Sequence, residues 1–131
     1  VIFLENYKNP ISISKSVEII YGLRNFIGNA NKFSKRKIEI SLISDNKSTI
    51  IKIRDDGPGF PKDLIDKQKL GEPYIRTYNQ ENISKYGLGL GTFIGKTLLE
   101  KNLANINFNN SKENKGAEVT IKWDNKDLKK I

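Results

Sequence analysis

The stretch KSVEIIYGLRNFIGNANKF, residues 15–33, carries the pattern from which the fold is inferred. Its apolar side chains recur at spacings of three and four residues, which is the period of a helix with one face on a core. These residues are Ile19, Leu23, Phe26, Ala30 and Phe33. We expect this helix to run from Lys15 to about Lys32, capped by the hydroxyl of Ser14 or Ser16. Polar residues of the same helix are expected on the side opposite the stripe, namely Asn25, Asn29 and Lys32.

The segments around this helix alternate apolar and polar residues, which is typical of strands half-buried in a sheet. Residues 37–44 and 50–54 are joined by a short polar turn and predict an antiparallel hairpin. The other expected elements are strands at 11–14, 106–108 and 117–123 and helices at 61–67 and 87–103. This order predicts an α+β fold, a two-layer sandwich with helices on one face of a mixed, mostly antiparallel sheet.

Length and composition narrow the possible functions. The 131 residues suit a single domain, which we place at 1–131. The chain has no Cys and no His, which excludes thiolate or imidazole zinc sites, His-dependent catalysis and a phosphohistidine on this chain. The net charge is +8, but Lys outnumbers Arg and is scattered, so no nucleic acid is expected as partner. The chain also lacks Met, so we expect a piece of a longer protein.

The first motif with chemical content is the pair Asn25 and Asn29, which share one helical face. Neutral carboxamide oxygens can complete the shell of Mg²⁺ while phosphates supply the negative ligands. Lys32, three residues further on, can meet a phosphate as a point charge. The alternative is an exposed polar helix face in an Asn-rich chain.

Two glycine motifs follow. The run DDGPG at 55–59 comes directly after a strand, where its glycines allow a turn and the close approach of a flat ligand. A carboxylate there can accept a hydrogen bond from an exocyclic amine such as that of adenine. The alternative is an ordinary acidic turn, which would have the same sequence pattern. The run GLGLG at 87–91 opens a helix, where free N–H groups favour an anion. It follows a long polar stretch at 69–85, and loops of that length are commonly functional or disordered.

The order Asn-x-x-x-Asn-Ala-x-Lys-Phe, Asp-x-Gly-x-Gly and Gly-Leu-Gly-Leu resembles the catalytic ATP-binding domain of sensor histidine kinases, in the Bergerat-type ATPase superfamily. The resemblance covers about residues 10–123. Residues 71–74 and 87–100 are similar, more narrowly, to the RegB/PrrB-type redox-responsive sensor kinases of proteobacteria. The resemblance implies a Bergerat-type fold with a long ATP lid at about 61–85.

The resemblance also implies roles for matching residues. Asn29 would be the principal Mg²⁺ ligand with Asn25 beside it, Lys32 would face the phosphates, and Arg76 would reach the γ-phosphate. Asp55 would bind the adenine amine. The other nucleotide contacts would be Phe33, Gly57, Gly59, Tyr74, Lys85, Gly87, Leu88, Gly89 and Leu90. Lys85 stands where the family usually has glycine, and residues 116–117 fit the turn that precedes its last strand.

By this resemblance the chain binds ATP with Mg²⁺ and transfers the γ-phosphoryl group to a histidine on an upstream helical dimerisation domain. A response regulator would receive it next. ATPases of the superfamily carry Glu at the position of Asn25, and an amide cannot activate water, so we expect slow hydrolysis. The isolated domain would be monomeric, and the full protein a homodimer anchored in the inner membrane with this domain in the cytoplasm. The alternatives are an anti-sigma-type serine kinase, a chaperone- or repair-type ATPase, or a binding module that has lost its nucleotide.

Overall fold

The computed structural model describes residues 2–7, 13–62, 65, 90–112 and 116–130, with side chains omitted for 2–7 and 90–91. One five-stranded sheet has the order β1-β2-β3-β5-β4. Its strands are β1 (Ile2–Tyr7), β2 (Ile38–Ser44), β3 (Ser48–Asp55), β4 (Asn105–Asn110) and β5 (Ala117–Asp124). The helices are α1 (Val17–Phe33), α4 (Leu90–Lys101) and the short α5 (Asn125–Leu128). β1 is parallel to β2 and all other pairs are antiparallel, so the mixed, mostly antiparallel sheet is confirmed.

Helix α1 forms where its periodicity predicts. Ser16 caps it, because its hydroxyl oxygen accepts a hydrogen bond from the backbone N–H of Ile19 at 3.3 Å. Ile19, Phe26 and Ala30 are buried on the sheet, as the apolar stripe requires. The core below them includes Ile53 of β3, together with the alternate residues Val119, Ile121 and Trp123 of β5.

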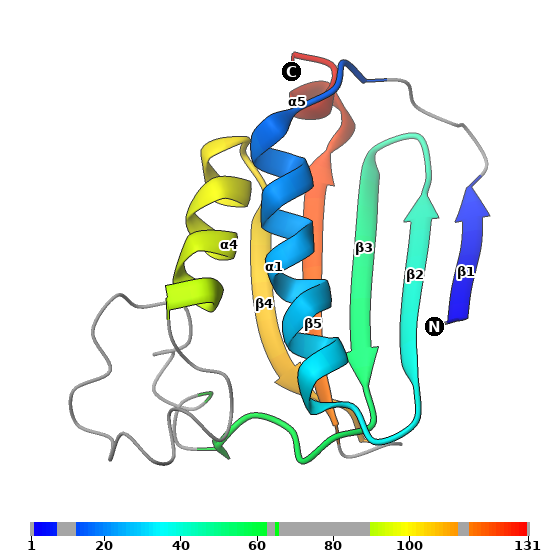
Figure 1. Ribbon diagram of the computed structural model, residues 1–131. Coiled ribbons are helices and arrows are strands. Elements are labelled where there is room, and N and C mark those ends of the chain that lie inside the picture. The colour runs from blue at the N-terminus through cyan, green and yellow to red at the C-terminus, as the bar shows by residue number, and fades with distance from the viewer. Residues whose placement is uncertain (1, 8–12, 63–64, 66–89, 113–115, 131) are drawn as a thin grey trace.

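Helices α1 and α4 lie side by side on one face of the sheet (Figure 1). Two glycines allow this close contact. A Cβ added at Gly22 would lie 2.6 Å from Leu99 of α4, and one added at Gly95 would lie 3.1 Å from the ring of Phe26. The two-layer arrangement with helices on one face is therefore confirmed, and it fixes the start of α4 beside the last turns of α1.

The N-terminal strand differs from the prediction. Residues 13 and 14 belong to no strand, residues 11 and 12 lie outside the described part, and the first strand is instead β1 at Ile2–Tyr7. The sequence IFLENY does not alternate regularly between apolar and polar residues. The strand is held in the sheet by parallel pairing with β2, to which it is connected through α1. Of the helix expected at 61–67, the structure describes Pro61, which is not helical, and Lys62 and Ile65, which are. Most of the expected lid at 61–85 lies outside the described residues.

Asp56, in the turn after β3, connects that turn to the segment between α1 and β2. Its carboxylate accepts hydrogen bonds from the backbone N–H groups of Lys35, Arg36 and Lys37, at 2.7, 3.1 and 3.2 Å to Oδ1. These three residues connect α1 to β2. The bonds, led by that of Arg36, hold the pKa of Asp56 below its ordinary value of 3.8.

Asp56→Asn should therefore lower the stability of the domain at neutral pH. A lowered folded pKa means that this stabilisation is present above 3.8 and is lost as the pH falls through the folded value. Thermal unfolding across this range should show the wild-type advantage shrinking in acid. Asp124→Asn is the control, since its side chain makes no cap hydrogen bond. An advantage that stays constant down to well below 3.8 would contradict this role for the charge.

Candidate nucleotide site

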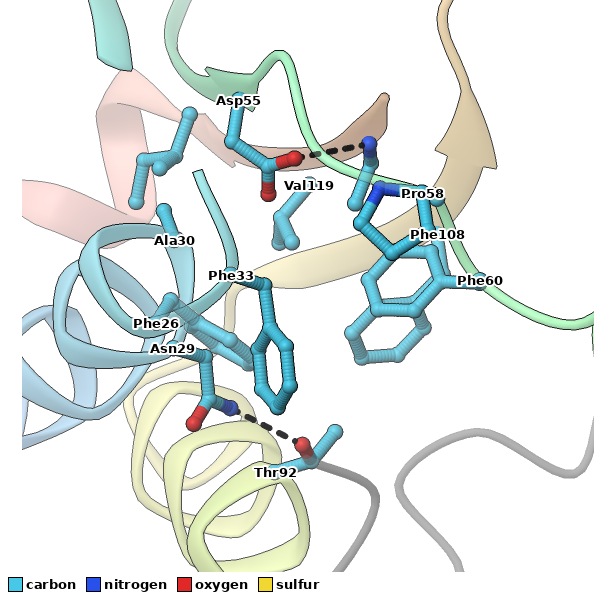
Figure 2. A pocket seen from close by; sticks show the side chains of 13 residues that line it. Phe26, Asn29, Ala30, Phe33, Asp55, Pro58, Phe60, Thr92, Phe108 and Val119 are labelled. Carbon is cyan, nitrogen blue, oxygen red and sulfur yellow. Dashed lines mark hydrogen bonds between the residues drawn. The ribbon is translucent and has the colours of Figure 1, made fainter. Parts of the chain in front are cut away.

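A pocket opens where β3 ends and α4 begins, between the two helices and the sheet (Figure 2). The empty space between its walls is about 490 Å³, part of it open to solvent. The side chains that line it come from α1, β3, β4, β5, the turn after β3, and the first turn of α4. They are Phe26, Asn29, Ala30, Phe33, Ile53, Asp55, Pro58, Gly59, Phe60, Thr92, Phe108, Ala117 and Val119.

Asp55 marks one end of the pocket. Only 6% of its surface is exposed, and its Oδ1 accepts hydrogen bonds from the backbone N–H groups of Gly57 at 2.8 Å and Ala117 at 3.3 Å. The second carboxylate oxygen points into the pocket toward Val119 (Figure 2). Burial raises the pKa of Asp55 above 3.8, against the two N–H bonds that lower it. The result is a buried hydrogen-bond acceptor directed into the pocket.

Aromatic rings form the middle of the pocket. The ring of Phe108 meets those of Phe26 and Phe60 edge to face, with centroids 5.8 and 5.7 Å apart. Asn110 fixes Phe60 from behind: its Oδ1 accepts from the backbone N–H of Phe60 at 2.7 Å, and its Nδ2 donates to the Phe60 carbonyl at 3.0 Å. These walls are apolar and firmly held, which suits a flat ring ligand.

Asn29 and Thr92 mark the other end (Figure 2). The Nδ2 of Asn29 donates a hydrogen bond to the Thr92 hydroxyl oxygen at 3.1 Å, and Thr92 is 3% exposed. Thr92 is the third residue of α4, so the first turn of that helix borders the pocket here. The first N–H groups of a helix have no partner within it and favour an anion. A ligand with a ring at Asp55 and negative charge at α4 would match both ends.

The structure brings together several of the residues expected from sequence. Asn29, Phe33, Asp55 and Gly59 line the pocket, and Gly59 has a φ of 82°, which glycine adopts freely. Gly57 contributes its N–H to Asp55.

Asn25 and Lys32 are not among the described residues that line the pocket. The Nδ2 of Asn25 donates to the carbonyl of Tyr21, at 2.8 Å, on its own helix. The Lys32 ammonium lies exposed, 5.3 Å from the centre of the Phe33 ring. The expectation that the polar residues of α1 face away from the packed side was wrong for Asn29, which is hydrogen-bonded to α4. Asn25 also borders Gly95 of α4. Both contacts arise because α4 packs on that side of α1.

The remaining expected contacts cannot be placed. Leu90 begins α4, and its side chain lies outside the described part. The residues that are not described at all are Tyr74, Arg76, Lys85, Gly87, Leu88 and Gly89. In turn, the sequence analysis missed Thr92 and Asn110, placed Phe26 only on the face toward the core, and placed Phe108 only in a strand.

The donors present fit a magnesium nucleotide better than a resident metal centre. Among the described residues, no three His, Cys, Asp or Glu side chains group together to hold a metal ion. The amide oxygen of Asn29 points away from Thr92, and a single neutral oxygen suits Mg²⁺ only when phosphates and water complete its shell. A cation here would therefore arrive with the phosphates.

Comparison with known proteins agrees with this geometry. A family profile described as "Histidine kinase-, DNA gyrase B-, and HSP90-like ATPase" matches residues 15–127. The chain belongs to this ATPase family. Membership supports the use of ATP, and it places the pocket within a known type of nucleotide-binding domain.

Individual relatives are sensor histidine kinases. RegB of Cereibacter sphaeroides is 36% identical over 88% of this chain, and the chain spans 28% of that protein. The mycobacterial sensor histidine kinase MprB superimposes with a TM-score of 0.67 at 20% identity, covering 94% of this chain and 80% of the other. Full-length ShkA, solved with AMPPNP, gives a TM-score of 0.60 at 21% identity over 92% of this chain and 25% of the other. The structural likeness confirms the sandwich fold.

No helix in the described part of the chain combines the length and the apolar character that a membrane crossing requires.

Proposed function

We propose that this domain binds ATP with Mg²⁺ and transfers its γ-phosphoryl group to a histidine on a helical dimerisation domain of the same protein. A response regulator would then take the phosphoryl group. The observation that carries the proposal is the pocket itself, with a buried carboxylate at one end and, at the other, a carboxamide beside the start of α4. The chain contains no His, so the acceptor lies outside these 131 residues.

The adenine belongs at the Asp55 end. Oδ1 of Asp55 is already bonded to two backbone N–H groups, which fixes the carboxylate and leaves the other oxygen directed into the pocket. An exocyclic amine would donate to that oxygen, and the rings of Phe33, Phe60 and Phe108 would flank the base. A guanine presents a carbonyl at the same position, so the acceptor selects adenine.

The phosphates belong at the α4 end. The first N–H groups of α4 would bind their oxygens, and the amide oxygen of Asn29 would meet the cation that they carry. The cation would neutralise charge that develops on the phosphoryl group during transfer. Lys32, exposed on the same helix, would add a positive charge near this end.

The polar groups of the pocket favour transfer over hydrolysis. Asp55 is the sole carboxylate among the described residues that line it, and it lies at the adenine end. Asn25 carries an amide, which cannot take a proton from water, and that amide is bonded to Tyr21. The names of the relatives support the same direction, since RegB and MprB are both sensor histidine kinases.

The partner domain and the regulator belong to the proposal as well. We expect the isolated domain to be monomeric, the whole protein to dimerise through helices outside this chain, and the kinase to be anchored in the inner membrane with this domain in the cytoplasm.

Calorimetry with ATP, in Mg²⁺ and in EDTA, tests the binding step. Asn29→Ala should weaken the Mg²⁺-dependent part of the affinity, because it removes the amide oxygen, whereas Asn31→Ala, exposed on the same helix, should not. Equal Mg²⁺ dependence in both variants would contradict the role of Asn29. A wild type that binds no nucleotide would favour a binding module that has lost its ligand.

Labelled ATP tests the transfer step in the full protein. The label should appear on a histidine, as an acid-labile and alkali-stable phosphoprotein. An acid-stable phosphoserine would instead indicate a serine kinase. Rapid release of free phosphate with no phosphoprotein would indicate an ATPase.

A further inference from the structure

We propose that Thr92 is a positioning residue, whose hydroxyl holds the Asn29 carboxamide so that the amide oxygen faces the phosphates and their cation. This inference rests on the proposed function. It assigns a role to a residue that lies outside the asparagine motif and both glycine motifs. Thr92 follows the Gly-rich run by one residue, and its side chain reaches back to α1.

The orientation of the Asn29 amide decides what it can bind. A carboxamide has an oxygen and an NH₂ group of nearly equal size, and turning it by half a rotation exchanges an acceptor for a donor. In the structure the Nδ2 of Asn29 donates to Oγ1 of Thr92 at 3.1 Å. The oxygen is consequently on the other side of the amide, away from Thr92 (Figure 2).

The surroundings of Thr92 keep this bond in place. Thr92 is 3% exposed, so water competes little for its hydroxyl. The close packing of α1 on α4 at Gly22 and Gly95 holds the two helices at a fixed separation. Because the bond joins residues 63 positions apart, it also ties the carboxamide to the first turn of α4. The bond therefore fixes the position of Asn29, the proposed cation ligand, relative to the first turn of α4, where the phosphates would bind.

Thr92→Val tests the proposal, since valine keeps the shape of threonine and removes the acceptor. Calorimetry with ATP should show an affinity about three- to tenfold lower in Mg²⁺, the usual worth of one net hydrogen bond, and an unchanged affinity in EDTA. Thr92→Ser keeps the hydroxyl and should restore the wild-type values. Thr97→Val is the matched control, because Thr97 is exposed on the same helix.

Thr92→Ala provides a second variant without the hydroxyl, and it should reproduce the same selective loss if Thr92→Val folds poorly. Wild-type Mg²⁺ dependence in a folded Thr92→Val or Thr92→Ala would overturn the role of Thr92. Equal weakening in Mg²⁺ and in EDTA would also overturn it, since that result indicates a purely structural residue. A wild-type domain whose ATP affinity ignores Mg²⁺ would overturn the proposed magnesium site, and this inference with it.

Discussion

Asp55→Asn is expected to lower the affinity for ATP by about ten- to a hundredfold, the worth of a hydrogen bond to a charged group, while the domain stays folded. Asparagine can still accept the N–H bonds of Gly57 and Ala117 through its own Oδ1. Its NH₂ group then takes the place of the oxygen that faces the pocket, and it meets the adenine amine donor to donor. Calorimetry with ATP and GTP measures both the loss and the change in base selection.

The stability of the same variant should change in the opposite direction. Burial raises the pKa of Asp55 above 3.8, so its contribution to stability is fully present below 3.8 and is lost as the pH rises through the folded value. At neutral pH the ionised, buried side chain therefore costs stability, and Asn removes that cost. Thermal unfolding should show Asp55→Asn at least as stable as the wild type at neutral pH, with the difference shrinking toward acid.

Asp124→Asn again serves as the control, because it removes an exposed carboxylate remote from the pocket. Two results would contradict the role of Asp55. One is equal affinity of the wild type for ATP and GTP, and the other is an Asp55→Asn variant that binds ATP as the wild type does. A variant that merely unfolds would show the residue to be structural, and the pH series would reveal this.

Local patterns were enough to predict the elements that have one buried face. The three- and four-residue spacing located α1, and alternation located the β2–β3 hairpin and β5 to within two residues at each end. Strand β1 has no such signal, because its sequence IFLENY does not alternate apolar and polar residues, and it pairs in parallel with β2, more than thirty residues away. Its position depends on the crossover through α1, which becomes evident only once the sheet exists.

The candidate site divides in the same way. Asp55 and Asn29 stand in motifs whose spacing indicates their chemistry, and both line the pocket. Asn110 is one of four asparagines in β4, and only the folded structure shows that its amide reaches the backbone of Phe60. The role of Thr92 likewise cannot be predicted from sequence, since its hydroxyl is hydrogen-bonded to a residue of another helix. Side chains that act across elements need the packed structure.

Gly116→Ala should cost about 3 kcal/mol or more in the free energy of unfolding. Gly116 directly precedes β5, and a Cβ there would overlap the carbonyl oxygen of Asp55 and lie 2.6 Å from its carbonyl carbon. Both obstacles are backbone, so neither can rotate aside, and β3 and β5 would have to separate. Urea unfolding measures the loss. Gly28→Ala is the matched control: its added Cβ meets nothing within 4 Å in the interior of α1, and it should stabilise by about 0.5–1 kcal/mol.

The same substitution should also damage the pocket, because the next residue, Ala117, donates its N–H to Asp55. A shift of β5 away from β3 lengthens that bond and releases the carboxylate that selects adenine. We therefore expect ATP affinity to fall along with stability in Gly116→Ala, whereas Gly28→Ala changes stability alone. If Gly116→Ala unfolds at the wild-type urea concentration and binds ATP normally, the start of β5 can move aside freely, and the support that this backbone gives to Asp55 is not needed for binding.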